Sequence, residues 1–196
     1  MAISEMMVYH RDQCWDRYFL IFINDLDYGI SNWILTFADD TKIFGSITSE
    51  KDIVSLQKDL GRLIQWADEW LMMFNTSKCK VMHFGKKELN SVDYYMSDQC
   101  LTSVTEEKDL GVVVSSDMKS SQQCNQSYSK ASRMLAMINC TIVYKNSENL
   151  LRLYKSLVRP HLEYCTAAWS PHYIKDRVLP EKVQQRFTRM VPGLKK

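Results

Sequence analysis

The chain has 196 residues, of which 45% are apolar and 24% charged, with only 6 glycines and 4 prolines. This composition is that of an ordinary globular protein, and it excludes the disordered, collagen-like and low-complexity classes. The formal net charge of +2 conceals an uneven distribution, because residues 1–98 carry −5 and residues 99–196 carry +7. The asymmetry predicts that the second half meets an anion, while the first half gathers carboxylates, in part around a metal cation.

The sequence carries no sign of secretion or of a membrane. No apolar run reaches the roughly 18 residues of a membrane span, and residues 1–16 contain no apolar signal-peptide region. The six cysteines lie far apart with no C-x-x-C pair, which predicts reduced, buried thiols without a disulfide partner. We therefore expect an intracellular protein, nuclear or cytoplasmic, that is not secreted; the sequence leaves its oligomeric state open.

The first predicted elements are short and apolar. Residues 1–17 show neither a helical nor a strand period and are expected to be a foreign leader. The apolar run at 19–26 is readable as a buried helix or as a strand end. Two β-branched and aromatic runs at 33–37 and 41–44 flank an acidic dipeptide, which predicts two short strands joined by an acidic turn.

The strongest periodic signal predicts a helix across residues 48–74. Its apolar residues fall on one face at helical spacing: Ile53, Leu56, Leu60, Leu63, Ile64, Ala67, Trp70 and Leu71. Ser49 and Asp52 have the spacing of a capping box at its start. Strands are expected beyond it, at 80–85, 92–96 and 112–114.

From about residue 122 the pattern is helical and basic. One apolar stripe runs from Tyr128 to Ile142, and a second runs from Leu150 and must stop at Pro160. A third helix is expected to begin with Pro180 as its first residue. The sequence thus predicts an α+β fold, divided into a leader (1–17), a strand-rich part (18–118) and a helical basic part (119–196).

Two adjacent carboxylates, Asp39 and Asp40, lie in the expected turn between apolar strands. Adjacent side chains of a regular strand point to opposite faces, whereas a turn lets both reach one side. Hard oxygen ligands there suit Mg²⁺, which also takes water and substrate phosphates. The alternative is that Asp-Asp is simply favourable turn chemistry. The apolar strands on either side favour a metal-dependent nucleotidyl-transfer site.

Several sequence blocks, in this order, resemble the reverse transcriptase of non-LTR retrotransposons, of the LINE type and similar to chicken repeat 1. The blocks are FLIFINDL at 19–26, FADDTK at 37–42, WADEWLMMFNTSKCKVMHFG at 66–85, KDLGV at 108–112, LYKSLVRPHLEY at 153–164 and WSP at 169–171. The resemblance spans residues 18–196. It implies a truncated palm of antiparallel strands plus a helix, then a thumb- or connection-like segment, and RNA-directed DNA polymerase activity on an RNA template and a DNA primer.

The resemblance also implies roles for individual residues. Asp39 would be the main ligand of Mg²⁺ and Asp40 the supporting one, so that the metal activates the primer 3′-hydroxyl and stabilises the leaving pyrophosphate. Lys78 matches a lysine-bearing motif that could protonate the pyrophosphate; the alternative is a solvated turn lysine. Leu110 and Gly111 match the primer grip; the alternative for Gly111 is an ordinary turn glycine.

The resembled enzyme also needs residues that this sequence does not contain. They are a third carboxylate upstream of Asp39, a Gly- and Gln-bearing motif that packs against the incoming nucleotide, and the fingers domain. Asp12 and Asp16 are not expected to substitute, because nothing places them on a strand facing Asp39. Two carboxylates from one turn cannot fix two Mg²⁺ ions about 4 Å apart. We therefore expect an incomplete fragment with little or no polymerase activity.

The basic end is the second candidate region. Residues 128–196 hold 13 Lys/Arg against 4 Asp/Glu, interleaved with aromatic residues. Cations track phosphates and aromatic rings stack on bases, so the composition fits a template- or primer-holding surface; solvated lysines are the alternative. The candidate contacts form two strips, one of Arg152, Lys155 and Arg159 and one of Lys182, Arg186 and Arg189. A nucleic-acid-binding or structural relic without catalysis is thus the alternative function.

Overall fold

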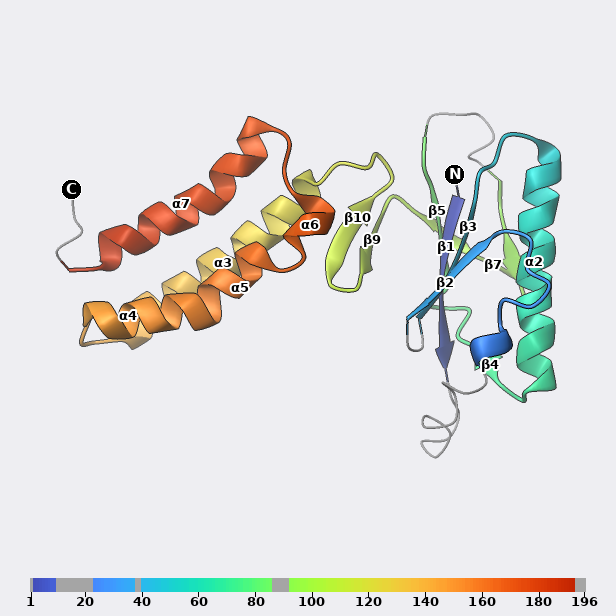
Figure 1. The fold of residues 1–196 in the computed structure, drawn as a ribbon, viewed down its shortest axis with the longest axis horizontal. Helices are drawn as coiled ribbons and strands as arrows, with labels where there is room; N and C mark the ends of the chain where they lie inside the picture. Colours follow the sequence, from blue (N-terminus) through green and yellow to red (C-terminus); the bar gives the residue numbers. More distant parts are fainter. Residues whose placement is uncertain (1, 10–22, 38–39, 86–91, 193–196) are drawn as a thin grey trace. The chain divides into compact units, whose positions relative to one another are not determined.

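A computed structural model describes residues 2–9, 23–37, 40–85 and 92–192 of the chain (Figure 1). The chain divides into two compact units, Met1–Glu107 and Lys108–Lys196, each of which is described by itself. Helices and small antiparallel strand pairs occur together, so the predicted α+β class is confirmed. The division at Glu107 comes earlier than the boundary predicted between residues 118 and 119.

The first unit is built on a six-stranded sheet. Its strands are β1 (Ala2–Tyr9), β2 (Trp33–Phe37), β3 (Asp40–Gly45), β4 (Met73–Phe74), β5 (Lys80–His83) and β8 (Thr102–Val104). Their order is β2-β3-β1-β5-β8, and β4 pairs with the end of β1. All of these pairs are antiparallel except β5–β8, which is parallel. The expectation of antiparallel strands is wrong for this last pair, because the chain between β5 and β8 returns to the same end of the sheet.

Strand β1 lies at the centre of this sheet and corrects the expectation that residues 1–17 form no regular element. Residues 2–7 pair with β3 on one edge, and residues 2–5 pair with β5 on the other. Pairing on both edges satisfies the backbone groups of this segment, which is why it is a strand although its sequence has no clear alternation. The remainder of the expected leader lies outside the described residues.

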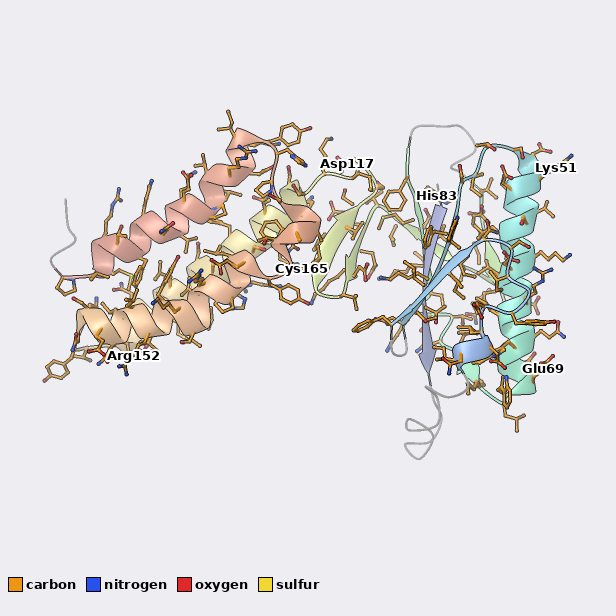
Figure 2. All side chains as sticks on the ribbon, viewed as in Figure 1. Lys51, Glu69, His83, Asp117, Arg152 and Cys165 are labelled. Atoms are coloured by element: carbon orange, nitrogen blue, oxygen red, sulfur yellow. The ribbon has the colours of Figure 1, made fainter. Side chains whose placement is uncertain are left out.

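Helix α2 (Glu50–Glu69) covers one face of the sheet. The prediction of a helix here is confirmed, together with the capping box of Ser49 and Asp52. Its buried face packs on Ile43 and Val81 through side chains at helical spacing: Leu56, Leu60, Leu63 and Ala67. In Figure 2 the labels of Lys51 and Glu69 mark its two ends. The helix ends before the predicted residue 74, because the chain turns at Leu71 (φ 55°) and enters β4.

Two small elements complete the first core. The hairpin of β6 (Tyr95–Met96) and β7 (Gln99–Cys100) is held to α2 by Gln57, whose amide donates to the Tyr95 carbonyl at 2.7 Å and accepts from the Tyr95 N–H at 3.0 Å. The 3₁₀ turn η1 (Ile23–Asp25) accepts a hydrogen bond from the Trp66 indole at 2.8 Å. Residues 19–22 of the apolar run lie outside the described part of the chain.

The second unit is mainly helical. After the strand pair β9 (Glu106–Asp109) and β10 (Val112–Ser115), its elements are α3 (Ser121–Thr141), α4 (Ser147–Leu153), the π-helix η3 (Tyr154–Val158), α5 (Arg159–Glu163), α6 (Thr166–Trp169) and α7 (Ile174–Met190). The stripe predicted on α3 is confirmed, and it packs against α5, η3 and α7 (Figure 1). The shared core consists of Ala131, Leu135, Ile138, Leu150, Val158, Leu162, Val183, Phe187 and Val191.

Two helix limits predicted from proline are wrong. The helical path continues through Pro160, because the π-helix η3 precedes it and the proline falls in the first turn of α5, where its missing N–H costs little. Helix α7 begins at Ile174 and contains Pro180 in its interior. Its first turns are held by tertiary contacts, since buried Asp176 accepts a hydrogen bond from the Ser121 hydroxyl at 2.7 Å and Leu179 packs beside Trp169.

The described cysteines are free thiols of two kinds. Cys79 and Cys124 are buried, and burial raises the pKa of Cys124. Cys100, Cys140 and Cys165 are exposed, so the expectation of buried thiols is wrong for these three. None of the helices in the described residues is both long and apolar enough to cross a membrane.

Candidate functional site

The acidic hairpin predicted from sequence is present. Strands β2 and β3 pair antiparallel, with Phe37 opposite Asp40 at the turn end. Asp40 is half-buried, and its Oδ1 atom is closed to solvent. Asp39, the residue expected to be the main metal ligand, lies outside the described residues, as does Ala38. The structure therefore places one of the two candidate carboxylates, at the start of β3.

Alternation along β3 assigns Asp40 to a definite face of the sheet. Thr41 and Ile43 are fully buried on the side of α2, so Asp40 and Lys42 lie on the opposite side. Their cross-strand partners on β2 are Phe37 and Leu35, which are exposed. The candidate carboxylate thus lies on the face of the sheet opposite α2 rather than in the core that α2 covers.

A buried carboxylate of α2 fixes the entry to this hairpin. Asp59 has no exposed surface, and its Oδ2 accepts from the backbone N–H groups of Ser31 and Asn32 at 2.9 and 2.8 Å and from the Asn32 amide at 2.9 Å. Its Oδ1 accepts from Arg62 at 2.8 Å, and Arg62 also donates to the Gly29 carbonyl. Sequence reasoning missed this residue, because an Asp on a helix ordinarily faces solvent.

Strand β1 pairs with β3 beside Asp40, so its register shows which residues lie next to the candidate carboxylate. In β1 the register places Met7 opposite Asp40, and Glu5 lies between Lys42 and Lys80. Within the described ranges no three His, Cys, Asp or Glu residues come together as a metal-binding group. Among the described residues, Asp40 is therefore not part of a cluster of metal-ligating side chains, and its role as a Mg²⁺ ligand stays a prediction.

Lys78 lies in the turn between β4 and β5 and is exposed. Strand β1 relates this turn to Asp40, because consecutive β1 residues, Met7 and Val8, pair with Asp40 and with Phe74 of β4 respectively. Two strand spacings, about 10 Å, separate paired residues on opposite edges of one strand. The sheet thus brings the lysine-bearing turn to the same end as Asp40.

The candidate primer-grip residues form the tight turn of the β9–β10 hairpin. Leu110 and Gly111 both have positive φ, 43° and 88°, as the two central residues of a type I′ turn require. The Tyr164 hydroxyl donates to the Leu110 carbonyl at 2.9 Å, and the Cε1 atom of its ring lies 3.2 Å from the position that a Cβ on residue 111 would take. The positive φ and this tight contact therefore favour glycine at position 111; the sequence alone does not point to Tyr164.

The first cationic strip is exposed but partly neutralised. Arg152 donates to Glu148 and Arg159 donates to Glu163, each at 2.6 Å across one helical turn. The carboxylate of Glu163 raises the pKa of Arg159. Lys155 lies between the two arginines on η3, and Figure 2 shows Arg152 on the outer surface of α4. Exposed pairs of this kind contribute little to stability.

The second strip lies on α7, where Lys182, Arg186 and Arg189 are exposed. The Arg186 guanidinium lies 5.8 Å from the centre of the Tyr128 ring of α3, within cation–π range. At 100° per residue these three cations fall on one side of α7. Both strips are therefore exposed rows of cations, the cationic rows, and they lie on different elements of the same unit.

Comparison with known proteins identifies one distant relative among the curated sequences. The chain is 24% identical over 166 residues to the RNA-directed DNA polymerase from mobile element jockey of Drosophila melanogaster. The match covers 79% of this chain but 18% of the relative, so the chain spans under a fifth of its length. This similarity supports a reverse-transcriptase relationship of the non-LTR, LINE type. No protein-family profile matches the chain, and no solved structure matches it.

Proposed function

We propose that this protein is a reverse-transcriptase-related module that binds nucleic acid through its helical unit and does not polymerise DNA on its own. The similarity to the jockey polymerase gives the lineage. The observation that carries the binding function is the pair of exposed cationic rows on one helical unit, at Arg152, Lys155 and Arg159 and at Lys182, Arg186 and Arg189. RNA template and DNA primer are the partners that this lineage suggests.

The catalytic half of the proposal rests on the neighbours of Asp40. Phosphoryl transfer by two Mg²⁺ ions requires several carboxylates converging on one point. Asp39 is the neighbour of Asp40 in the sequence, but the residue opposite Asp40 on β1 is Met7 rather than a carboxylate. Mg²⁺ held at this turn would supply a Lewis acid for a primer hydroxyl and a phosphate. Asp39 and Asp40 would bind it, and Lys78 would place a cation at the same end of the sheet.

The rival function is template-directed polymerisation, and the antiparallel pairing of β2 with β3 on either side of the acidic dipeptide favours it. A primer-extension assay separates the two. The full chain is incubated with a DNA primer on an RNA template, deoxynucleotides and either Mg²⁺ or Mn²⁺. We expect no extension above the level of the Asp40→Ala variant. Template-dependent extension that is abolished by Asp39→Ala and by Asp40→Ala would establish polymerisation and contradict our proposal.

The same preparation tests binding. Fluorescence anisotropy with a labelled single-stranded RNA should show affinity that falls as salt rises, because bound cations displace the counterions of the phosphates. Asp40→Ala should leave this affinity unchanged, whereas neutralising the cationic rows should weaken it. If RNA does not bind even at low salt, the binding function is wrong.

A further inference from the structure

A groove opens in the second unit between the π-helix η3 with its flanking helices and α7. Its volume is about 510 Å³, within the range of small-molecule sites. Most of the lining surface is apolar, although the ten lining residues divide equally between apolar or aromatic ones (Leu151, Tyr154, Leu162, Pro180 and Phe187) and polar or charged ones (Lys155, Arg159, Glu163, Gln184 and Thr188). Neither the acidic hairpin nor the primer-grip turn contributes to it.

The floor of this groove is a pair of stacked rings. The centres of Tyr154 and Phe187 lie 4.1 Å apart, with 20° between their planes. Phe187 is buried while Tyr154 is half-buried, and burial raises the pKa of the tyrosine, so its hydroxyl stays neutral. Tyr154 is also the first residue of η3, and π-helices occur often at functional sites.

Of the two cationic rows, only the first contributes residues to the rim of the groove. Lys155 and Arg159 of the first row line it, and Glu163 offsets one of these two charges. On α7 the groove residues Gln184, Phe187 and Thr188 lie about half a turn away from Lys182, Arg186 and Arg189. The groove thus combines an aromatic floor with cations from the first row alone.

We propose that this groove holds an unpaired nucleotide of a single-stranded nucleic acid, with Lys155 and Arg159 at its phosphates and the apolar floor against its base. The inference rests on the proposed nucleic-acid binding and adds a substrate class to it. A planar apolar ring joined to an anion matches a floor of stacked rings beside a net positive rim. In a duplex the bases are already stacked on one another, so only the phosphates would reach this site.

Three labelled probes of equal length test the inference on the full chain: a single strand, a strand of abasic nucleotides, and a blunt duplex. We expect the single strand to bind at least roughly fivefold more tightly than the abasic strand, because each stacked base contributes measurably to affinity. The duplex should bind no more tightly than the abasic strand. Equal affinity for all three probes would show that the cations alone act and would overturn the inference, while leaving nucleic-acid binding intact.

A matched pair of variants ties the preference to the groove. Gln184 and Gln185 are adjacent exposed residues of α7, and only Gln184 lines the groove. Gln184→Glu and Gln185→Glu are isosteric and change the net charge equally. We expect Gln184→Glu to weaken single-strand binding at least roughly fivefold relative to Gln185→Glu, with equal effects on the duplex. Equal weakening of single-strand binding by the two variants would overturn the inference, and absence of binding to every probe would overturn the proposed function with it.

Discussion

Gly111 shows how a single residue can be required by its surroundings rather than by chemistry. Its φ of 88° lies in the region that residues with a Cβ rarely adopt, and the ring of Tyr164 would lie only 3.2 Å from a Cβ at this position. The match of this residue to a primer grip remains a prediction. Its structural role in the β9–β10 turn follows from geometry alone.

Gly111→Ala should therefore destabilise the protein. We expect the free energy of unfolding in urea to fall by about 1–2 kcal/mol, through backbone strain and the contact with Tyr164. Gly61→Ala is the matched control, because Gly61 lies in α2 with open space around its Cβ position. That change should leave stability equal or raise it by up to about 1 kcal/mol. Equal effects of the two alanines would contradict this account of the turn.

Asp59 is the residue on which the entry to the acidic hairpin depends. In Asp59→Asn an NH₂ group replaces one of the two carboxylate oxygens. In either orientation this NH₂ group faces a hydrogen-bond donor, from Arg62 or from Asn32, instead of accepting from it. We expect a loss of unfolding free energy on the order of 3 kcal/mol. Asp68→Asn, at an exposed position of the same helix, should change stability little. Chemical denaturation of both variants is the measurement, and a tolerated Asp59→Asn would contradict the role given to this carboxylate.

At the scale of elements, the N-terminal cap of α2 should make the stability of the fold depend on pH. Hydrogen bonds from Thr48 and Ser49 lower the pKa of Asp52 from 3.8 to about 2. A carboxyl group with a lowered pKa in the folded state stabilises the fold above its unfolded pKa, and this contribution is lost as pH falls through the folded value. The loss should therefore take place between about pH 4 and about pH 2.

Asp52→Asn removes this titration. The stability of the parent protein should fall more steeply than that of the variant as pH drops across this window, and the two should run parallel above it. Urea midpoints measured over the acid range give the comparison. The difference between the proteins isolates Asp52 from Asp117, whose pKa is also lowered to about 2. A difference that stays constant with pH would show that the capping hydrogen bonds do not act as described.

The elements that the sequence could predict are those whose pattern is local. The period of α2 and α3, the capping box and the β2–β3 hairpin all come from residues close in the chain. Strand β1 could not be predicted, because residues 2–9 are placed by pairing with β3 and β5, which are distant in sequence. The helix limits predicted from Pro160 and Pro180 were wrong for the same reason. A π-helix precedes Pro160 and tertiary packing holds the first turns of α7, so both helical segments continue past their prolines.

In the candidate site, too, the local features could be predicted from the sequence and the long-range contacts could not. The position of Asp40 next to the second strand of the hairpin, the exposed turn of Lys78 and the exposed cationic rows could be predicted from residue types and spacing, although Asp40 begins β3 instead of lying in the turn. The Asp59 hydrogen bonds and the groove beside Tyr154 could not, because each joins residues from separate elements. Pairing of Arg152 and Arg159 with nearby glutamates was also absent from the prediction, and it reduces the charge that each arginine offers to phosphate.

At the scale of the whole molecule, the charge imbalance of the sequence acquires a physical basis in part. The excess of cations falls mainly in the unit Lys108–Lys196, where the candidate contacts are exposed. The acidic excess of the first half is dispersed: Asp59 is a buried structural anion, Asp52 caps a helix, and Asp40 lies in the hairpin. Most of this negative charge therefore does not gather at one metal site in the described residues.

The salt dependence of RNA affinity tests the central claim most directly. For the full chain, the logarithm of the binding constant for a single-stranded RNA should fall linearly with the logarithm of salt concentration. Lys155→Gln and Lys182→Gln each remove one exposed cation. Removal of a lysine that contacts a phosphate should make the slope of that line shallower by about one. The account predicts such a reduction for Lys155→Gln and for Lys182→Gln, with no change for Asp40→Ala. A salt-independent affinity, or no affinity at low salt, would contradict it.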